Sequence, residues 1–276
     1  MKRRPEDLYL DLLKHTLSFT LWPEPLIPID TFNYRRSLFK KLVVSFISRI
    51  LKSKQLQLVQ QKAFTPDQRE EGMIWPGYAD TMIGLKRLDN LQFCVETVIR
   101  ERVEGDLIET GVWRGGACIF MRAVLAAYGI EDRKVYVADS FEGLPKPDPE
   151  KFPADKGNKF YIHPYLAVSK EDVEYNFRKY GLLDDQVVFL KGWFKDTLPQ
   201  APIENLSILR LDGDMYGSTM DSLENLYPKL SSSGFCIIDD YALRGCKSAV
   251  DDYRAKQKIN SEMKEIDWTG RYWRKE

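Results

Sequence analysis

The chain has 276 residues, 43% of them apolar and 30% charged, a composition typical of a globular protein with a substantial core. Lys plus Arg and Asp plus Glu number 41 each, and this zero net charge argues against the broad basic surface of a nucleic-acid-binding protein. The four cysteines show no CxxC spacing and indicate buried thiols, and two distant histidines argue against zinc. Without a signal-like segment or a run of roughly 20 apolar residues, we expect a cytoplasmic protein with no stable membrane insertion.

The N-terminal segment predicts two helices outside the core. Residues 6–21 have apolar side chains at helical spacing, and Pro23 and Pro25 end that helix. Residues 35–54 predict an amphipathic helix with seven basic residues and no acidic one. Such a helix either lies on an anionic membrane or, as is more common in soluble proteins, serves as a lid or subunit contact. We expect 1–72 to be a helical extension that makes lid or oligomer contacts in a homo-oligomer, dimer or tetramer.

From residue 88 onward, helical and extended patterns alternate, which indicates βαβ units and a parallel sheet. The last two predicted strands are joined by a Thr269-Gly270 turn and must form an antiparallel hairpin. We therefore predict an α/β, Rossmann-like domain over 73–276, with a mostly parallel seven-stranded sheet and an antiparallel C-terminal hairpin. The predicted strands are 107–111, 135–139, 187–190, 206–209, 235–238, 262–266 and 272–275, and the predicted helices are 88–102, 117–128, 171–180, 222–230 and 248–258.

Two acidic clusters directly follow apolar strands. Asp212 and Asp214 come after the fourth predicted strand, and Asp239 and Asp240 after the fifth. The carboxyl ends of neighbouring parallel strands meet at one crevice, where carboxylates repel one another unless a cation neutralises them. Carboxylate oxygens suit magnesium or calcium better than zinc or copper. We therefore predict a divalent-metal site, with an ordinary turn at the first cluster and a helix cap at the second as the alternatives.

A glycine-rich loop, Glu109-Thr110-Gly111-Val112-Trp113-Arg114-Gly115-Gly116, follows the first predicted strand. Glycines let the backbone approach a ligand closely and leave N–H groups free at the start of the next helix. The loop matches neither the dinucleotide fingerprint nor the P-loop, which disfavours a dehydrogenase. Taken alone, it is equally typical of a simple turn from strand to helix.

The next two strand ends add nucleoside-binding features. Asp139 ends the second strand, where a carboxylate can accept both ribose hydroxyls, and the loop from Ser140 to Leu144, with Gly143, continues into the crevice. The segment 191–198 offers an aromatic and a polar edge for an adenine. Together these strand ends favour a nucleoside with little phosphate charge, and S-adenosylmethionine fits that profile better than NAD or ATP.

Five ordered motifs resemble the macrocin O-methyltransferase family: ETGVWRGG, ADSFEGLP, GWFKDTLP, LDGDMYGST and IDDY. The resemblance covers 73–276 and the Leu-Tyr-Leu-Asp-Leu-Leu-Lys segment near the N-terminus, whereas 21–68 shows no match. It implies a class I methyltransferase fold and a magnesium-dependent enzyme. Such enzymes use S-adenosyl-L-methionine to methylate sugar hydroxyls of macrolide and aminocoumarin antibiotics.

The resemblance also implies roles for individual residues. It implies that Asp212, Asp239 and Asp240 are the Mg²⁺ ligands. The residues that it implies for cofactor binding are Thr81, Met82, Glu109, Gly111, Val112, Asp139, Ser140, Gly143 and Asp196.

Methyl transfer to an alkyl hydroxyl needs help because such a hydroxyl has a high pKa. A cation bound to the sugar hydroxyls lowers that pKa and orients the oxygen, and a nearby carboxylate can then remove the proton. We assign this general base to Asp214. Because strand alternation can turn Asp214 away from the site, Asp212 acting as both ligand and base is the alternative.

The function predicted from the sequence is therefore methylation of a sugar hydroxyl on a glycosylated natural product, with a small-molecule glycoside as the partner. Methylation of a catechol or another vicinal-diol small molecule is the alternative reaction. A noncatalytic protein that kept a methyltransferase fold is the alternative of a different class. The intact glycine loop and acidic clusters argue against that last possibility.

Overall fold

The computed structural model describes residues 3–23, 25–29, 37–60 and 64–276. Within these residues a seven-stranded sheet has the order β5-β4-β3-β6-β7-β9-β8. The strands from β5 to β7 in this order are parallel, and β9 pairs antiparallel with both β7 and β8. This confirms the predicted mostly parallel sheet with its antiparallel C-terminal hairpin. The strands are β3 (Asp106–Thr110), β4 (Val135–Asp139), β5 (Val187–Lys191), β6 (Leu206–Leu211), β7 (Leu230–Ile238), β8 (Lys264–Glu265) and β9 (Arg271–Arg274).

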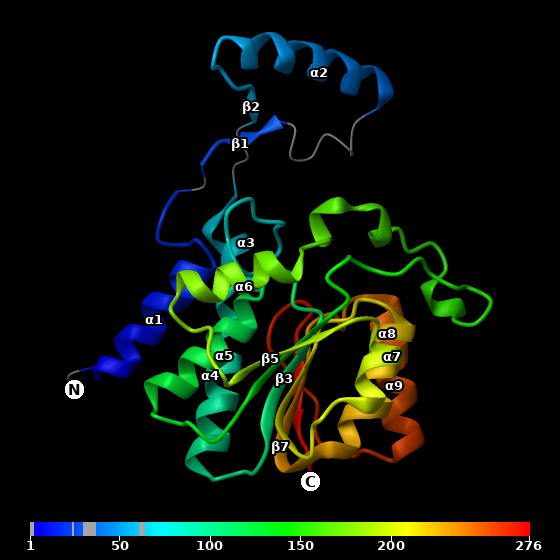
Figure 1. Cartoon of the computed structure of the whole chain (residues 1–276). Helices are drawn as coiled ribbons and strands as arrows, with labels where there is room; N and C mark the ends of the chain where they lie inside the picture. The colour runs from blue at the N-terminus through cyan, green and yellow to red at the C-terminus, as the bar shows by residue number, and fades with distance from the viewer. Residues whose placement is uncertain (1–2, 24, 30–36, 61–63) are drawn as a thin grey trace.

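Helices cover both faces of this sheet (Figure 1). One group comprises α1 (Pro5–Leu17), α4 (Leu85–Arg100), α5 (Gly116–Ala127) and α6 (Lys170–Lys179). The opposite group comprises α7 (Phe194–Thr197), α8 (Tyr216–Leu226) and α9 (Arg244–Gln257). Short 3₁₀ turns complete the chain: η2 (Pro153–Asp155), η3 (Phe160–Ile162), η4 (Pro164–Leu166), η5 (Leu198–Gln200) and η6 (Tyr227–Lys229).

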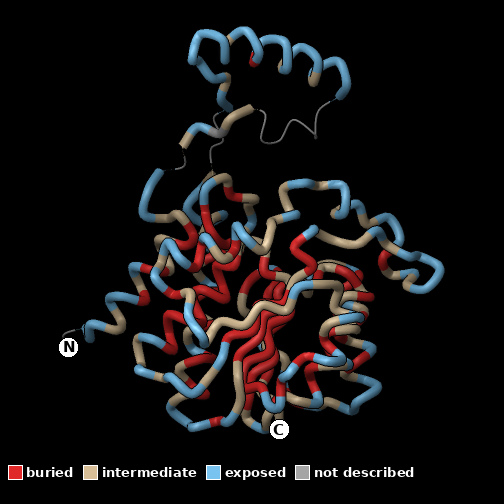
Figure 2. The backbone as a smooth tube through the Cα atoms, viewed as in Figure 1, coloured by how far each residue is buried: buried red, intermediate tan, exposed pale blue. Residues whose placement is uncertain are grey.

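Side-chain alternation along the strands separates two hydrophobic cores. In β3, Leu107 packs in the core shared with α4 and α5, and its neighbour Ile108 packs in the core shared with α8 and α9. Successive strand residues point to opposite faces, so uninterrupted apolar runs are required when both faces are covered. Figure 2 shows the result as a band of buried strands between half-exposed helices.

The helix bounds differ from the predicted ones by one to six residues, and α8 and α9 begin furthest ahead of their predicted starts. The helix predicted at 222–230 is α8, which begins at Tyr216 and ends at Leu226, and the helix predicted at 248–258 is α9, which begins at Arg244. Each starts earlier because its first turn contains glycine, a poor helix former that the sequence pattern assigns to a loop. At the other end of α8, Pro228 disfavours α-helix at the preceding residue, and the chain continues as η6.

The two N-terminal helices differ in how they meet the body. In α1, Leu10, Leu13 and Leu17 are buried in the core that includes α4 and α5. By contrast, α2 (Leu38–Ser53) stands away from the sheet on a short connection that includes β1 (Ile27–Pro28) and β2 (Val59–Gln60), while α3 (Pro66–Glu70) returns to the body (Figure 1). The first residues of the predicted helix 35–54 lie outside the described residues. In the part of the chain that is described, no helix is both long and apolar enough to cross a membrane.

A chain of alternating buried charges crosses three neighbouring strands on the α4 side of the sheet. Arg210 of β6 pairs with Glu109 of β3 and with Asp239, which directly follows β7. Arg87 of α4 contacts the other Asp239 oxygen at 2.5 Å and Asp267, in the β8–β9 turn, at 2.8 Å. All five side chains are buried. The chain therefore fixes the carboxyl ends of β3, β6 and β7 relative to α4 and to the C-terminal hairpin.

Replacement of Arg210 with Met should strongly destabilise the protein. It leaves two buried carboxylates without their shared cation, and breaking such a pair typically costs about 3–5 kcal/mol. Urea unfolding measures this loss of unfolding free energy. The control is Lys256→Met, because Lys256 forms an exposed pair with Glu224 that is expected to contribute about 0–1 kcal/mol. A loss in Arg210→Met no larger than in this control would contradict the central role of the buried chain.

Candidate active site

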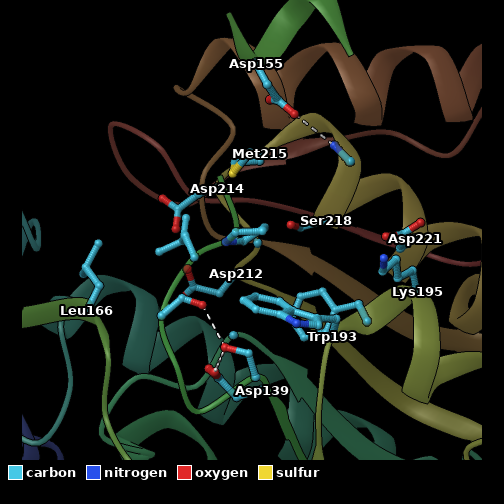
Figure 3. A pocket seen from close by; sticks show the side chains of 18 of the residues that line it. Asp139, Asp155, Leu166, Trp193, Lys195, Asp212, Asp214, Met215, Ser218 and Asp221 are labelled. Atoms are coloured by element: carbon cyan, nitrogen blue, oxygen red, sulfur yellow. Dashed lines mark hydrogen bonds between the residues drawn. The ribbon is translucent and has the colours of Figure 1, made fainter. Parts of the chain in front are cut away.

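A cavity of about 360 Å³ opens at the carboxyl ends of β3, β4, β5 and β6. Its walls come from the glycine loop after β3, the ends of β4 and β5, the β6–α8 turn and the long segment between β4 and α6 (Figure 3). The volume lies within the range of about 300–1,000 Å³ that is usual for small-molecule sites. The strand ends singled out in the sequence therefore meet at one cavity.

Asp139 links two loops at the cavity wall. One carboxylate oxygen accepts a hydrogen bond from the Val112 backbone N–H at 2.8 Å, and the other accepts from the Phe141 N–H at 2.7 Å. Burial raises the pKa of Asp139 above its ordinary value, while these N–H donors oppose that shift. The carboxylate is thus held in place at the end of β4, facing the cavity.

Gly111 allows the first loop to approach the β6–α8 turn. Its φ of +88° lies in the left-handed region, and a Cβ atom there would stand 1.8 Å from the backbone oxygen of Asp212. A side chain at this position would collide with the turn that carries the acidic cluster. The glycine is therefore required by both conformation and space.

The predicted cofactor residues fall into two groups. Five of them line the cavity: Met82, Gly111, Asp139, Ser140 and Gly143. The remaining four lie outside its lining: Thr81, Glu109, Val112 and Asp196.

The four residues outside the lining have different surroundings. Thr81 is buried, and Val112 contributes its backbone N–H to Asp139. Glu109 lies in the buried charge chain and also accepts a hydrogen bond from the Cys118 thiol, with the sulfur 2.9 Å from the carboxylate. Asp196 is exposed on α7, and Trp193 from the same segment lines the cavity.

Three carboxylates gather beside the cavity. One oxygen from each of Asp212, Asp214 and Asp240 lies within 4.8 Å of the others. The Asp240 carboxylate also accepts a hydrogen bond of 3.0 Å from the Asp214 backbone N–H. Burial and the neighbouring carboxylates raise the pKa of Asp214 to about 8 and raise the pKa of Asp212 and Asp240 as well. Such a cluster of oxygen donors fits a hard divalent cation.

Asp239 lies apart from this group although it neighbours Asp240 in sequence. Its two carboxylate oxygens face Arg87 and Arg210, and the side chain is buried. Successive residues at the end of β7 point to opposite sides, so Asp239 points toward α4 when Asp240 points toward the β6–α8 turn. The structure therefore brings Asp212 and Asp240 together as predicted, but Asp214, not Asp239, supplies the third carboxylate of the group.

Sequence reasoning missed the residues that hold the site in place. Arg210 lies two positions before Asp212 within a buried strand, and a charged residue in such an apolar run was a usable signal. Arg87 carried no comparable signal, because its partners are 152 and 180 residues away in sequence. Asp155, which is buried above the acidic turn, was equally hidden within a loop.

Aromatic residues fasten the long loop over the glycine loop. Trp113 donates a hydrogen bond from its indole N–H to the Tyr165 carbonyl at 3.0 Å, and Trp75 stacks on the Tyr165 ring with centroids 5.4 Å apart. Arg114 lies over the Trp113 ring at 4.3 Å and donates to the Ala79 carbonyl at 2.7 Å. The segment before α4, the glycine loop and the loop before α6 therefore form one cover at this end of the cavity.

Comparison with known proteins identifies the family. The model of the macrocin O-methyltransferase (TylF) family matches residues 6–275. The chain is 49% identical to the 8-demethyl-8-(2,3-dimethoxy-alpha-L-rhamnosyl)-tetracenomycin-C 4'-O-methyltransferase of Streptomyces olivaceus, over 99% of this chain and 95% of that protein. It is 53% identical to the mycinamicin III 3''-O-methyltransferase of Micromonospora griseorubida, over 79% of this chain and 87% of that protein.

A solved structure agrees with these matches. The structure of the O-methyltransferase NovP superposes with a TM-score of 0.82 at 46% identity, covering 98% of this chain and 99% of that chain. This similarity confirms the predicted class I methyltransferase fold. The chain belongs to the macrocin O-methyltransferase family and is an S-adenosylmethionine-dependent O-methyltransferase.

Proposed function

We propose that this enzyme methylates a hydroxyl on the sugar of a glycosylated natural product. The observation that carries the proposal is the cavity itself, because its wall around Asp139, which we assign to the cofactor nucleoside, adjoins the Asp212–Asp214–Asp240 cluster. The proposal is supported by relatives whose names specify methylation at the 4' position of a rhamnosyl compound and at the 3'' position of mycinamicin III.

We assign the cofactor to the wall formed by the ends of β3, β4 and β5. Asp139 is placed to accept the ribose hydroxyls, and Gly111 and Gly143 leave room for close approach of their backbones. Trp193 offers an aromatic face for the adenine in the segment where Asp196 was predicted to act. Val112 supports this wall through its backbone N–H, which donates to Asp139.

We assign Mg²⁺ to the acidic cluster, with Asp212 and Asp240 as ligands. When bound, the cation would lower the pKa of a sugar hydroxyl and orient its oxygen. Asp239, implied as a third ligand by the sequence resemblance, would have to weaken at least one of its two arginine contacts to take part. We therefore propose that Asp239 positions Asp240 and Asp212 through the charge chain.

Asp214 is the general base in this proposal. Its carboxylate lies in the same group as the two ligands and also lines the cavity, so a hydroxyl oriented there is within its reach. S-adenosylmethionine bound along the Asp139 wall would supply the methyl group to the hydroxyl oxygen and leave as a neutral thioether, and Asp214 would take the hydroxyl proton. Charge disappears as the sulfonium is lost, so correct positioning supplies much of the rate enhancement.

We expect the enzyme to add one methyl group to a glycosylated macrolide or a rhamnosyl aromatic polyketide whose sugar hydroxyls are free. Mass spectrometry detects the product, and addition of EDTA should abolish its formation until Mg²⁺ is restored. A catechol and the corresponding aglycone are the matched acceptors. Methylation of the catechol alone would support the vicinal-diol alternative. Binding of S-adenosylmethionine without turnover of any acceptor would support the noncatalytic alternative.

The ligand assignment is tested by calorimetric titration of Mg²⁺ into two neighbouring variants. Asp240→Asn should weaken Mg²⁺ binding at least tenfold, because it removes a charged ligand from the acidic cluster. Its thermal stability should stay close to wild type, because the removed charge repels its neighbours. Asp239→Asn should lower the melting temperature strongly, because it removes the carboxylate shared by two buried arginines. Loss of Mg²⁺ binding in folded Asp239→Asn, with normal binding in Asp240→Asn, would make Asp239 the ligand.

We also propose that the protein is a homo-oligomer formed through α2. The large apolar residues of this helix are exposed, including Leu38 at 79%, Phe39 at 76% and Leu42 at 70%, whereas Ser48 is buried. The helix thus turns its apolar face away from its own chain, and a contiguous apolar face of this kind marks an interaction surface.

The four cysteines are buried free thiols, consistent with the cytoplasmic location that we propose.

The double variant Leu42→Glu/Phe46→Glu should reduce the assembly to a monomer in sedimentation equilibrium, because two carboxylates cannot be buried in an apolar interface. Lys54→Glu, which changes charge at the end of the helix, is the control and should assemble normally. A monomeric wild type at about 10 µM would contradict the proposal. In that case, sedimentation of the wild type with anionic vesicles would identify α2 as a membrane-surface helix.

A further inference from the structure

Asp155 is a buried carboxylate in the long loop, and it lies against the start of α8. It is only 2% exposed, although aspartate is rarely buried without partners. One of its oxygens accepts a hydrogen bond of 2.7 Å from the Tyr216 N–H, and the other accepts one of 3.3 Å from the Gly217 N–H. Figure 3 shows its carboxylate directed at this end of the helix, above the cavity.

These two N–H groups belong to the first turn of α8 and have no carbonyl partner within the helix. Met215, the residue that precedes the helix, provides no side-chain cap. Asp155 therefore caps α8 from a position 61 residues earlier in the chain. The partial positive charge of the helix N-terminus also complements a carboxylate at this position.

Two glycines make room for this contact. A Cβ atom at Gly245, in the first turn of α9, would lie 2.4 Å from an Asp155 oxygen, and a Cβ atom at Gly217 would lie 2.7 Å from the Phe152 ring. Phe152 also packs on Tyr216, with ring centroids 5.5 Å apart. The loop is thus fitted closely onto the first turns of both α8 and α9.

The same contact joins two walls of the cavity. On the loop side, Lys151 and Phe152 line the cavity, and on the helix side, Asp214 and Met215 line it directly before α8. Asp214 has a φ of +56°, a left-handed conformation that is unfavourable for a residue with a side chain and persists only when its surroundings hold it. Its N–H is held by Asp240, and the helix that follows is held by Asp155.

We propose that Asp155 is a positioning residue. It fixes the carboxylate of Asp214 by holding the cavity-lining loop that contains Lys151 and Phe152 against the start of α8. The inference rests on the proposed role of Asp214 as general base. In this arrangement the loop that contains Lys151 and Phe152 and the turn that carries the base move as one unit. Loss of the clamp displaces the base while the cofactor wall around Asp139, which belongs to other strands, stays in place.

The test compares Asp155→Ala and Asp155→Asn with wild type in steady-state kinetics and in calorimetry with S-adenosylmethionine. In Asp155→Ala, kcat for the glycoside should fall about 10²-fold, the effect of misplacing a catalytic group by about 1 Å. Its Kd for S-adenosylmethionine should stay within about threefold of wild type. Asp155→Asn keeps one carbonyl oxygen for the Tyr216 N–H and should recover part of the lost kcat.

The matched control is Ser169→Ala, which removes the cap of α6, where the Ser169 hydroxyl accepts from the Asp172 N–H at 3.1 Å. It should lower the melting temperature, as cap removal does, and leave kcat unchanged. The inference is overturned if Asp155→Ala keeps kcat within threefold of wild type, or if its activity falls only by its unfolded fraction. An inactive wild type would instead overturn the proposed function, which separates the two failures.

Discussion

The buried charge chain from Glu109 through Arg210, Asp239 and Arg87 to Asp267 is the constraint on which the site depends. Its members come from β3, β6, the end of β7, α4 and the β8–β9 turn. A buried ion pair gains little net stability over apolar residues of similar volume, because desolvation offsets the attraction. Its effect here is geometric, since each carboxylate must meet a guanidinium in one fixed arrangement.

The acidic cluster obeys the opposite electrostatic logic. Burial of Asp212, Asp214 and Asp240, together with their mutual repulsion, raises their pKa values and expresses the cost of keeping three carboxylates in one place. The cluster persists because backbone contacts place it: Gly111 lets β3 approach the Asp212 backbone, and Asp240 accepts the Asp214 N–H. The fold thus maintains an arrangement that a cation would relieve, which is the electrostatic basis of the proposed magnesium site.

The two charge systems meet at Asp212. Arg210 contacts its carboxylate at 3.2 Å while also binding Glu109 and Asp239. One arginine therefore connects the buried chain to the edge of the cavity and limits the negative charge that the cluster presents. On the opposite side of the cluster, Asp155 anchors the start of α8 through backbone N–H groups. The acidic turn is thus held by Arg210, which contacts Asp212, and by Asp155, which caps the helix that follows the turn.

The sequence by itself determined which strands of the chain end in residues of the site. Apolar runs ending in Gly111, Asp139 and Asp212 are local patterns, and the rule that parallel strands share a carboxyl edge brings them together. Only the tertiary structure decided which of two neighbouring aspartates joins the acidic cluster. Asp239 and Asp240 are indistinguishable as a dipeptide, but Arg87 and Arg210 bind the first, and the second joins Asp212 and Asp214 in the acidic cluster. Those partners are up to 152 residues away in sequence, and no local periodicity encodes contacts over that separation.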